Sequence, residues 1–161
     1  MHIIITGGTI DKRYNELTGL VDFAPASHIE AMLHQARVNV DEYTITPLLL
    51  KDSLEITRED RAQILQSIQS SPSHQILITH GTDTIVKSAK FLSSYHLDKT
   101  IVLVGAMIPY RFKDSDALFN LGFAMGAAAT LEKGIYVAMN GRVFPHDRVI
   151  KNRELGLFEA L

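Results

Sequence analysis

The chain has 161 residues, of which 46% are hydrophobic and 21% are charged, with a formal net charge of −2 and no cysteine. This length and balance are those of an ordinary globular protein with one domain and a full core. The weak negative charge argues against a nucleic-acid-binding protein, and the lack of cysteine excludes disulfides, thiolate metal sites and a cysteine nucleophile.

The chain opens with MHIIITGG, in which residues 3–5 predict a short first strand. This opening has no basic segment, and its apolar run is too short for a signal peptide. No later stretch approaches the roughly 18 apolar residues of a membrane-spanning helix. The sequence therefore predicts a cytoplasmic protein without membrane contact.

The rest of the chain alternates between short β-branched runs and helical patterns. The predicted elements, in order, are a helix near 28–38, a strand at 42–50, a helix at 61–70, a strand at 75–80, a helix at 83–95, a strand at 100–106, a helix at 115–132 and a strand at 134–140. Ser27 is placed to cap the first helix, and Thr57 with Asp60 forms a capping box before the second.

The strand and helix patterns together predict a fold class. The first, third and fourth strands are almost continuously apolar, which is typical of strands that helices cover on both faces of a parallel sheet. We therefore expect one doubly wound α/β domain over residues 1–161. Its mostly parallel sheet would lie in a three-layer α/β/α arrangement of the Rossmann or flavodoxin type.

Small polar residues follow every predicted strand. These stretches are TGGTI at 6–10, KDS at 51–53, HGTDT at 80–84, GAM at 105–107 and NGR at 140–142, with Lys151 further along. Ligands of open α/β sheets bind outside the carboxyl ends of the strands. The candidate site is therefore assembled from these loops.

Each of these stretches also has a plain structural interpretation. The glycines at 7–8 suit a tight turn, and neither the dinucleotide nor the Walker spacing is present. Thr82 suits a helix N-cap, and Asp83 suits the helix dipole. The same carboxylate also suits a substrate ammonium, and the hydroxyl suits a proton relay to a base such as Lys151. A lysine in such a context is by default a solvated surface charge.

Two kinds of site have no support in the sequence. The seven histidines are scattered without a metal-ligand spacing. The G-x-S-x-G elbow of α/β serine hydrolases is missing. The sequence therefore favours neither a metal site nor a serine hydrolase of this fold.

Four segments in this order resemble the bacterial-type L-asparaginase family: TGGTI at 6–10, HGTDT at 80–84, VLVGAMIP at 102–109 and FNL at 119–121. The resemblance covers nearly the whole chain, and the first two motifs together are far more specific than either alone. It implies hydrolysis of the side-chain amide of L-asparagine to L-aspartate and ammonia, through a threonine nucleophile and a β-aspartyl ester. It implies no metal or organic cofactor.

The resemblance assigns roles to the matching residues. Thr9 resembles the nucleophile, and Thr82, Asp83 and Lys151 resemble a Thr-Asp-Lys relay in which Asp83 also binds the substrate ammonium. Tyr14 is the nearest tyrosine on the polar loop after Thr9 and resembles an activating tyrosine on a mobile lid.

Substrate contacts are expected from the same loops. Gly8, Gly81 and Ala106 would line the substrate, with backbone N–H groups around Gly8, Thr9 and Thr82 as donors to a tetrahedral intermediate. The family usually carries Ser-Gln or Ser-Ser where this chain has Asp52-Ser53. Ser53 or its loop would hold the substrate carboxylate, with Lys51 adding charge, while Asp52 would repel a carboxylate unless it turns toward the ammonium.

This departure leaves the substrate open. L-asparagine is the first expectation. The alternatives are glutamine, an amide on a larger molecule, or an amino acid that is bound without turnover.

The resemblance also bears on assembly. Long-chain members carry a smaller C-terminal domain that completes the site of a neighbouring protomer, and this chain resembles the N-terminal domain alone. It matches either a short-chain member or a deliberately shortened piece. The oligomers of the family and the apolar segment ALFNLGFAMGAAATL at 117–131 predict a homodimer or a higher homo-oligomer. Burial of this segment against the sheet explains its composition equally well.

Overall fold

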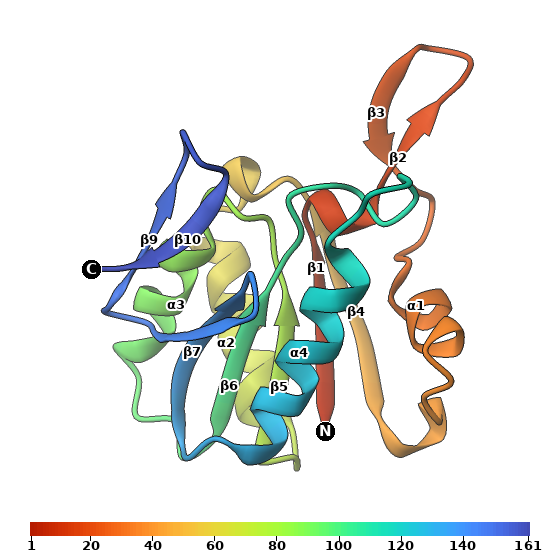
Figure 1. The fold of residues 1–161 in the computed structure, drawn as a ribbon. Coiled ribbons are helices and arrows are strands. Elements are labelled where there is room, and N and C mark those ends of the chain that lie inside the picture. The colour runs from red at the N-terminus through yellow and green to blue at the C-terminus, as the bar shows by residue number, and fades with distance from the viewer.

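The computed structural model describes all 161 residues and contains one six-stranded sheet with helices on both faces (Figure 1). Its strands are β1 (His2–Gly7), β4 (Thr44–Lys51), β5 (Gln75–Thr79), β6 (Thr100–Val104), β7 (Gly134–Met139) and β8 (Arg142–Pro145). They lie in the order β4-β1-β5-β6-β7-β8, and only β8 runs antiparallel to its neighbour. The five parallel strands thus follow the flavodoxin-like order 2-1-3-4-5. The predicted fold class is confirmed.

The centre of the sheet is apolar on both faces, as the strand sequences predict. The side chains of β1, β5 and β6 are almost completely buried. Ile4 of β1 lies opposite Ile78 of β5, and Ile78 lies opposite Leu103 of β6. Each such side chain contributes about 2–3 kcal/mol through its burial. This rigid centre fixes the positions of the loops at its carboxyl edge.

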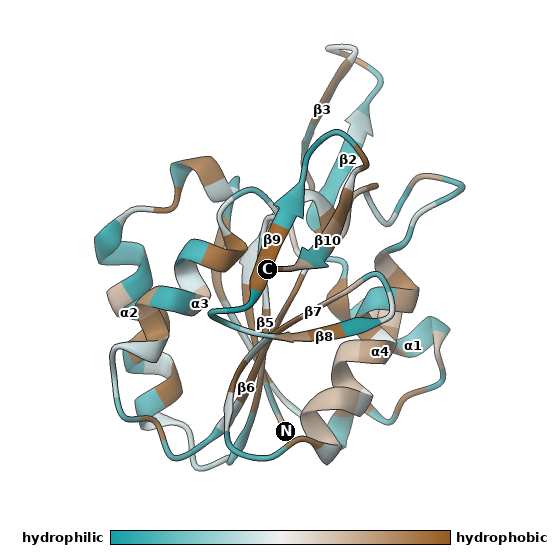
Figure 2. Cartoon of the chain, turned by 60° about the vertical axis from the view of Figure 1, so that its left-hand side comes forward, coloured by the Kyte–Doolittle hydropathy of each residue, from teal (hydrophilic) through white to brown (hydrophobic).

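Four helices complete the three layers. They are α1 (Ile29–Gln35), α2 (Arg58–Ser70), α3 (Ile85–Ser93) and α4 (Ala117–Thr130). Figure 2 shows α2 and α3 on one face of the sheet and α1 and α4 on the other. The predicted capping box of α2 is confirmed, because Thr57 and Asp60 exchange both bonds. The prediction that Ser27 caps α1 is wrong: His28 is the N-cap residue, and the Ser27 hydroxyl donates to Asp11 and accepts from the N–H of Ile29 at 3.2 Å.

Helix α4 packs closely on β5, β6 and β7 through small side chains. Ala124 and Ala128 are fully buried on the inner face. On the outer face Phe119 is 62% exposed and stacks on Phe123, with their ring centroids 6.2 Å apart. The apolar residues of α4 thus serve both the core and the surface, and self-association stays a prediction.

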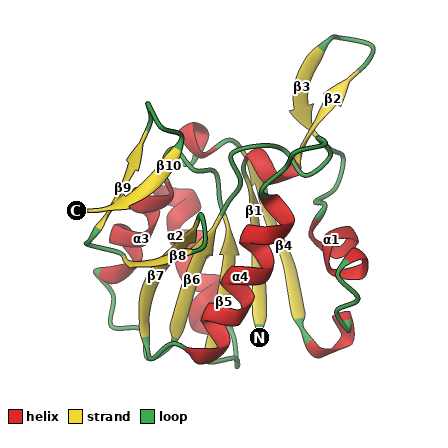
Figure 3. Ribbon diagram, in the orientation of Figure 1, coloured by secondary structure: helices red, strands yellow, loops and turns green.

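Two hairpins at the carboxyl edge of the sheet were not expected from the sequence (Figure 3). The first joins β2 (Lys12–Asn15) to β3 (Leu20–Phe23), in the stretch predicted to be a loop. The second joins β9 (Val149–Asn152) to β10 (Leu157–Ala160). The second is anchored by buried Val149 and Phe158 and by the N–H of Phe158, which donates to the Asn140 side chain at 2.9 Å. It brings Lys151 to the edge where the candidate site lies.

No helix in the chain is both long enough and apolar enough to cross a membrane.

Candidate active site

The loops after β1 and β5 touch each other at the carboxyl edge of the sheet. β1 and β5 are adjacent, which is the switch point of the 2-1-3-4-5 strand order. Gly8 has φ 87°, and a β-carbon built there would lie 2.4 Å from the backbone nitrogen of Gly81. This close approach places the loop that carries Thr9 against the loop that carries Thr82.

The contact explains why glycine is needed at position 8, and it gives a stability prediction. We expect Gly8→Ala to lower the free energy of unfolding by at least about 2 kcal/mol, since both the backbone angle and the space oppose a side chain. Gly19→Ala is the matched control, because Gly19 also has a positive φ of 71° but has no atom within 4 Å of its built β-carbon. Urea denaturation would contradict this expectation if both variants lost the same stability.

Thr82, Asp83 and Lys151 are brought together across 69 residues of sequence. The Lys151 ammonium donates to Thr82 Oγ1 at 2.8 Å and to Asp83 Oδ1 at 3.0 Å. Its side chain is only 14% exposed, so the interpretation as a solvated surface charge is wrong. The N-cap interpretation of Thr82 is also wrong, because α3 begins after Thr84 and the Thr82 hydroxyl faces Lys151 instead.

Asp83 has a second cationic partner that the sequence analysis missed. Arg153 Nη1 lies 3.0 Å from Asp83 Oδ1, and its side chain is 66% exposed. Arg153 lies in the turn directly after β9, so no periodic pattern in the sequence indicated it. The pair borders an open hollow of about 640 Å³, lined by Asp83, Val86, Lys87, Lys90, Val149, Ile150, Lys151, Arg153 and Leu161.

The charged residues after β4 turn to partners of their own. Lys51 bonds to Asp60 at 2.8 Å, which corrects the expectation that Lys51 adds charge to the substrate site. The capping-box carboxylate attracts it toward α2. Asp52 bonds to Lys12 at 2.6 Å, and this ammonium holds the pKa of the Asp52 carboxyl below its usual value. The repulsion expected from Asp52 is therefore compensated within the chain.

Ser53 lies buried against the β5 loop. A β-carbon at Gly81 would come within 2.6 Å of Ser53 Cβ, so only glycine fits at position 81. The Ser53 carbonyl accepts from Thr84 Oγ1 at 2.6 Å. The loops after β4 and β5 are thus in direct contact, as are those after β1 and β5.

Thr9 and Tyr14 occupy very different environments. Thr9 begins a 3₁₀ turn directly after Gly8 and is half-buried. Tyr14 lies on β2, opposite Val21, and is 58% exposed. Figure 1 shows that the β2–β3 hairpin projects away from the body of the domain. No hydrogen bond joins Tyr14 to Thr9 or to any other predicted site residue.

The loop after β6 is held in place by Asn120 of α4 and by close packing against His80. Ala106 is fully buried, and Gly105 lies so close to the His80 carbonyl that a β-carbon there would be 2.4 Å from its oxygen. Asn120, the central residue of the FNL segment, donates to the Gly105 carbonyl at 3.1 Å and accepts from the Asn140 N–H at 3.3 Å. Asn120 therefore ties the β6 loop to the β7 loop, a role that no sequence pattern indicated.

The fold and these contacts define the class of protein. It is a flavodoxin-like α/β domain with a candidate small-molecule site at its switch point. The site is built from loop hydroxyls, a carboxylate and a largely buried lysine.

The chain belongs to the asparaginase family. Residues 1–157 match the family described as asparaginase, N-terminal. A glutaminase-asparaginase from Acinetobacter glutaminasificans is 32% identical over 160 residues, which cover 92% of this chain and 48% of the relative. An L-asparaginase from Thermococcus kodakarensis is 32% identical, with 96% of this chain and 48% of the relative covered.

Other relatives in the family carry the name of a different enzyme. One component of the glutamyl-tRNA(Gln) amidotransferase from Methanococcus vannielii is 32% identical, with 88% of this chain and 34% of the relative covered. The solved thermostable L-asparaginase from Thermococcus kodakarensis superposes with a TM-score of 0.84 at 31% identity, over all of this chain and 51% of that one. The chain spans about half the length, or less, of the curated relatives it matches. These relatives place it in a family of amidohydrolases.

Proposed function

We propose that this chain hydrolyses the side-chain amide of L-asparagine to L-aspartate and ammonia. The observation that carries the proposal is the contact between Lys151 Nζ and Thr82 Oγ1 at 2.8 Å, in which both side chains are largely removed from water. A threonine hydroxyl is a weak nucleophile and needs a hydrogen-bonded acceptor for its proton. Thr82 carries a hydroxyl bonded to an amine, on the loop that touches the loop of Thr9, and we take it as the path for this proton.

In the proposed reaction Lys151 acts as the uncharged amine. Thr9 Oγ attacks the amide carbon while its proton passes through Thr82 Oγ1 to Lys151. The tetrahedral intermediate then collapses, the C–N bond breaks, and Lys151 returns this proton through Thr82 to the nitrogen, which leaves as ammonia. Water attacks the resulting β-aspartyl ester, releases aspartate and restores the Thr9 hydroxyl. Backbone N–H groups of the touching Gly8 and Gly81 loops supply donors to the oxyanion.

The two ends of the amino acid have proposed partners. Ser53 and the backbone of its loop would hold the α-carboxylate, since Lys12 already compensates the Asp52 charge. Asp83 would hold the α-ammonium through Oδ2, because Oδ1 accepts from Lys151 and Arg153. Gly8, Gly81 and Ala106 would form the walls. Tyr14 would act only when the β2–β3 hairpin folds back over this edge.

The Arg153 contact predicts a change in substrate affinity. We expect Arg153→Gln to lower KM for L-asparagine by up to about fivefold with kcat unchanged, since an exposed ion pair that competes for Asp83 is worth at most about 1 kcal/mol. Arg148→Gln is the matched control, because Arg148 is exposed nearby and forms no ion pair. A KM that rises in Arg153→Gln would instead assign Arg153 to a substrate carboxylate.

A panel of amides tests the function itself. Ammonia release from L-asparagine, and more slowly from glutamine, is the expected result. The names of the relatives, which include a glutaminase-asparaginase and part of an amidotransferase, make glutamine or a larger amide the second candidate. Calorimetry that detects aspartate binding, together with no ammonia from any amide, would replace hydrolysis by amino-acid binding without turnover.

A further inference from the structure

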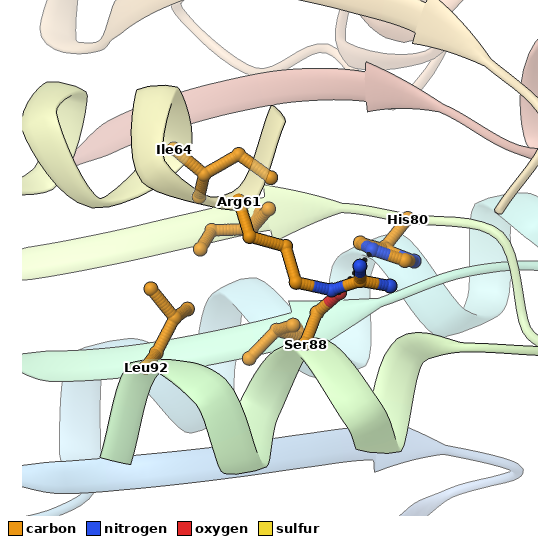
Figure 4. Close-up of a pocket in the computed structure, with 7 residues that line it drawn as sticks. Arg61, Ile64, His80, Ser88 and Leu92 are labelled. Carbon is orange, nitrogen blue, oxygen red and sulfur yellow. Dashed lines mark hydrogen bonds between the residues drawn. The ribbon is translucent and has the colours of Figure 1, made fainter. Parts of the chain in front are cut away.

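A buried arginine lies beneath the candidate site and belongs to none of the steps above. Arg61 of α2 is 4% exposed, forms no salt bridge and shares its pocket with Ile64, His80, Ser88 and Leu92 (Figure 4). The Asp60 carboxylate acts on this charge only at a distance and is itself paired with Lys51. A buried charge without a bonded opposite charge is costly, and an apolar side chain would suit these neighbours better. Stability alone therefore does not account for an arginine here.

Every hydrogen bond of this guanidinium ends on a group near the site loops. Arg61 Nη1 donates to the carbonyls of Ile56 and Thr57 at 2.9 and 3.0 Å, which fixes the guanidinium at the start of α2. Nε donates to Ser88 Oγ at 2.9 Å. Nη2 makes a longer contact of 3.4 Å with Thr84 Oγ1, which in turn donates to the Ser53 carbonyl.

The branch through Ser88 has only one consistent arrangement of protons. His80 Nδ1 lies 2.9 Å from the Gly81 carbonyl, which can only accept, so Nδ1 carries a proton. Complete burial lowers the pKa of His80 to about 4, and the Arg61 charge adds to the effect, so the ring is neutral near pH 7. His80 Nε2 is then an acceptor, and Ser88 donates to it at 2.8 Å.

The hydrogen bond from His80 to the Gly81 carbonyl, the last in this series, sets the direction of one peptide group. Because the Gly81 carbonyl is held toward the His80 ring, the N–H of the same trans peptide, which belongs to Thr82, points the opposite way. That N–H donates to no other group of the chain. A free donor held in one orientation, in the loop that touches the loop of Thr9, is what a developing oxyanion requires.

We propose that Arg61 is a positioning residue that acts through Ser88 and His80 to hold the Thr82 N–H toward the substrate as an oxyanion donor. This inference rests on the proposed amide hydrolysis. A charge at the head of a hydrogen-bonded chain polarises each bond along it. The guanidinium therefore keeps Ser88, His80 and the Gly81–Thr82 peptide in one orientation, and the Thr84 branch holds the Ser53 loop beside them.

The first experiment tests the hydrogen bonds from Arg61 through Ser88 to His80 and does not depend on catalytic activity. In ¹⁵N NMR of the histidine rings, with the His80 signal identified by its loss in His80→Gln, the wild-type ring should stay neutral and protonated at Nδ1 between pH 5 and 9. Arg61→Met and Ser88→Ala should both lose this fixed tautomer, and Arg58→Met, an exposed arginine of the same helix, should keep it. An unchanged His80 tautomer in Ser88→Ala would overturn the inference.

The second experiment measures kcat and KM of the same variants. Ser88→Ala removes one hydroxyl and should stay folded even if Arg61→Met does not. We expect its kcat for L-asparagine to fall about 10- to 100-fold with KM within about twofold, since a misplaced oxyanion donor acts only in the transition state. The kcat of Arg61→Lys should lie between the kcat of the wild type and that of Arg61→Met.

The outcomes separate this inference from the function on which it rests. A Ser88→Ala protein with a lower melting temperature, a lost tautomer and an unchanged kcat would reduce Arg61 to a structural role and overturn the proposal. A wild-type protein that releases no ammonia would overturn the proposed function and, with it, the catalytic part of this inference. The tautomer result would still decide whether the hydrogen-bonded chain exists.

Discussion

Replacing Thr9 with alanine is expected to reduce ammonia release from L-asparagine by about 10²-fold or more while leaving the protein folded. The hydroxyl is the proposed nucleophile, and no other group on this loop can form the ester. It forms no hydrogen bond within the chain, so its removal should change the free energy of unfolding by less than about 1 kcal/mol. Initial rates at saturating substrate, together with a urea transition, measure both effects.

Thr18→Ala is the matched control for this variant. Thr18 lies in the turn of the β2–β3 hairpin, is exposed and serves only its own turn, where it accepts from the Leu20 N–H. Its rate should stay at the wild-type level. Mass spectrometry of acid-quenched wild-type enzyme should detect the β-aspartyl adduct on the peptide that contains Thr9. An adduct on Thr82 instead would make Thr82 the nucleophile. A Thr9→Ala rate equal to that of Thr18→Ala would show that Thr9 is not the nucleophile.

The sheet was predictable because burial on both faces leaves a strong pattern. The runs at 3–5, 76–78 and 101–104 are unbroken apolar residues, and few structures other than a covered parallel strand require this. The two hairpins were not predicted because each of their strands has only four residues. Strands this short pair through a local turn and leave too few residues for a clear hydrophobic pattern.

The residues of the candidate site could be named from the sequence, but the contacts among them could not. Motifs identified Thr82 and Lys151, yet nothing in the sequence shows that the β9–β10 hairpin docks on Asn140 and buries the lysine. The direction of Lys51 was equally open, because a side chain at the end of a strand chooses between partners on either side. The Asp60 carboxylate decided that choice.

The exposure of Tyr14 limits how Thr9 can be activated in this conformation. With the hairpin extended, the proposed mechanism has only the Thr82 hydroxyl and an uncharged Lys151 amine as acceptors for the Thr9 proton. The hairpin is a regular two-stranded ribbon, so closure would move it as a unit about its base near Asp11. That base is fixed, since the Asp11 carboxylate accepts from the Ser27 hydroxyl and the His28 N–H, both at 2.8 Å.

Replacing Lys151 with methionine is the second change with a large expected effect. We expect kcat to fall by about 10²-fold or more, because the proton from the nucleophile loses its acceptor. The Thr82 hydroxyl also loses its hydrogen-bond partner, which should cost about 1–3 kcal/mol of stability. Lys133→Met is the matched control, since Lys133 also forms an ion pair, with Asp98, but lies on the exposed surface. Partial recovery of Lys151→Met by added methylamine would assign the loss to the missing amine.

A double-mutant cycle distinguishes a relay from two separate contributions. If Thr82 and Lys151 pass one proton, Thr82→Val, Lys151→Met and the double variant should lose nearly the same rate, because either change already breaks the path. If each residue acts alone, the losses should multiply, and the double variant should fall about 10⁴-fold. Multiplying losses would contradict the relay while leaving Thr9 as nucleophile. The contact of 2.8 Å between the two side chains favours the first result, since residues in one hydrogen-bonded network rarely contribute independently.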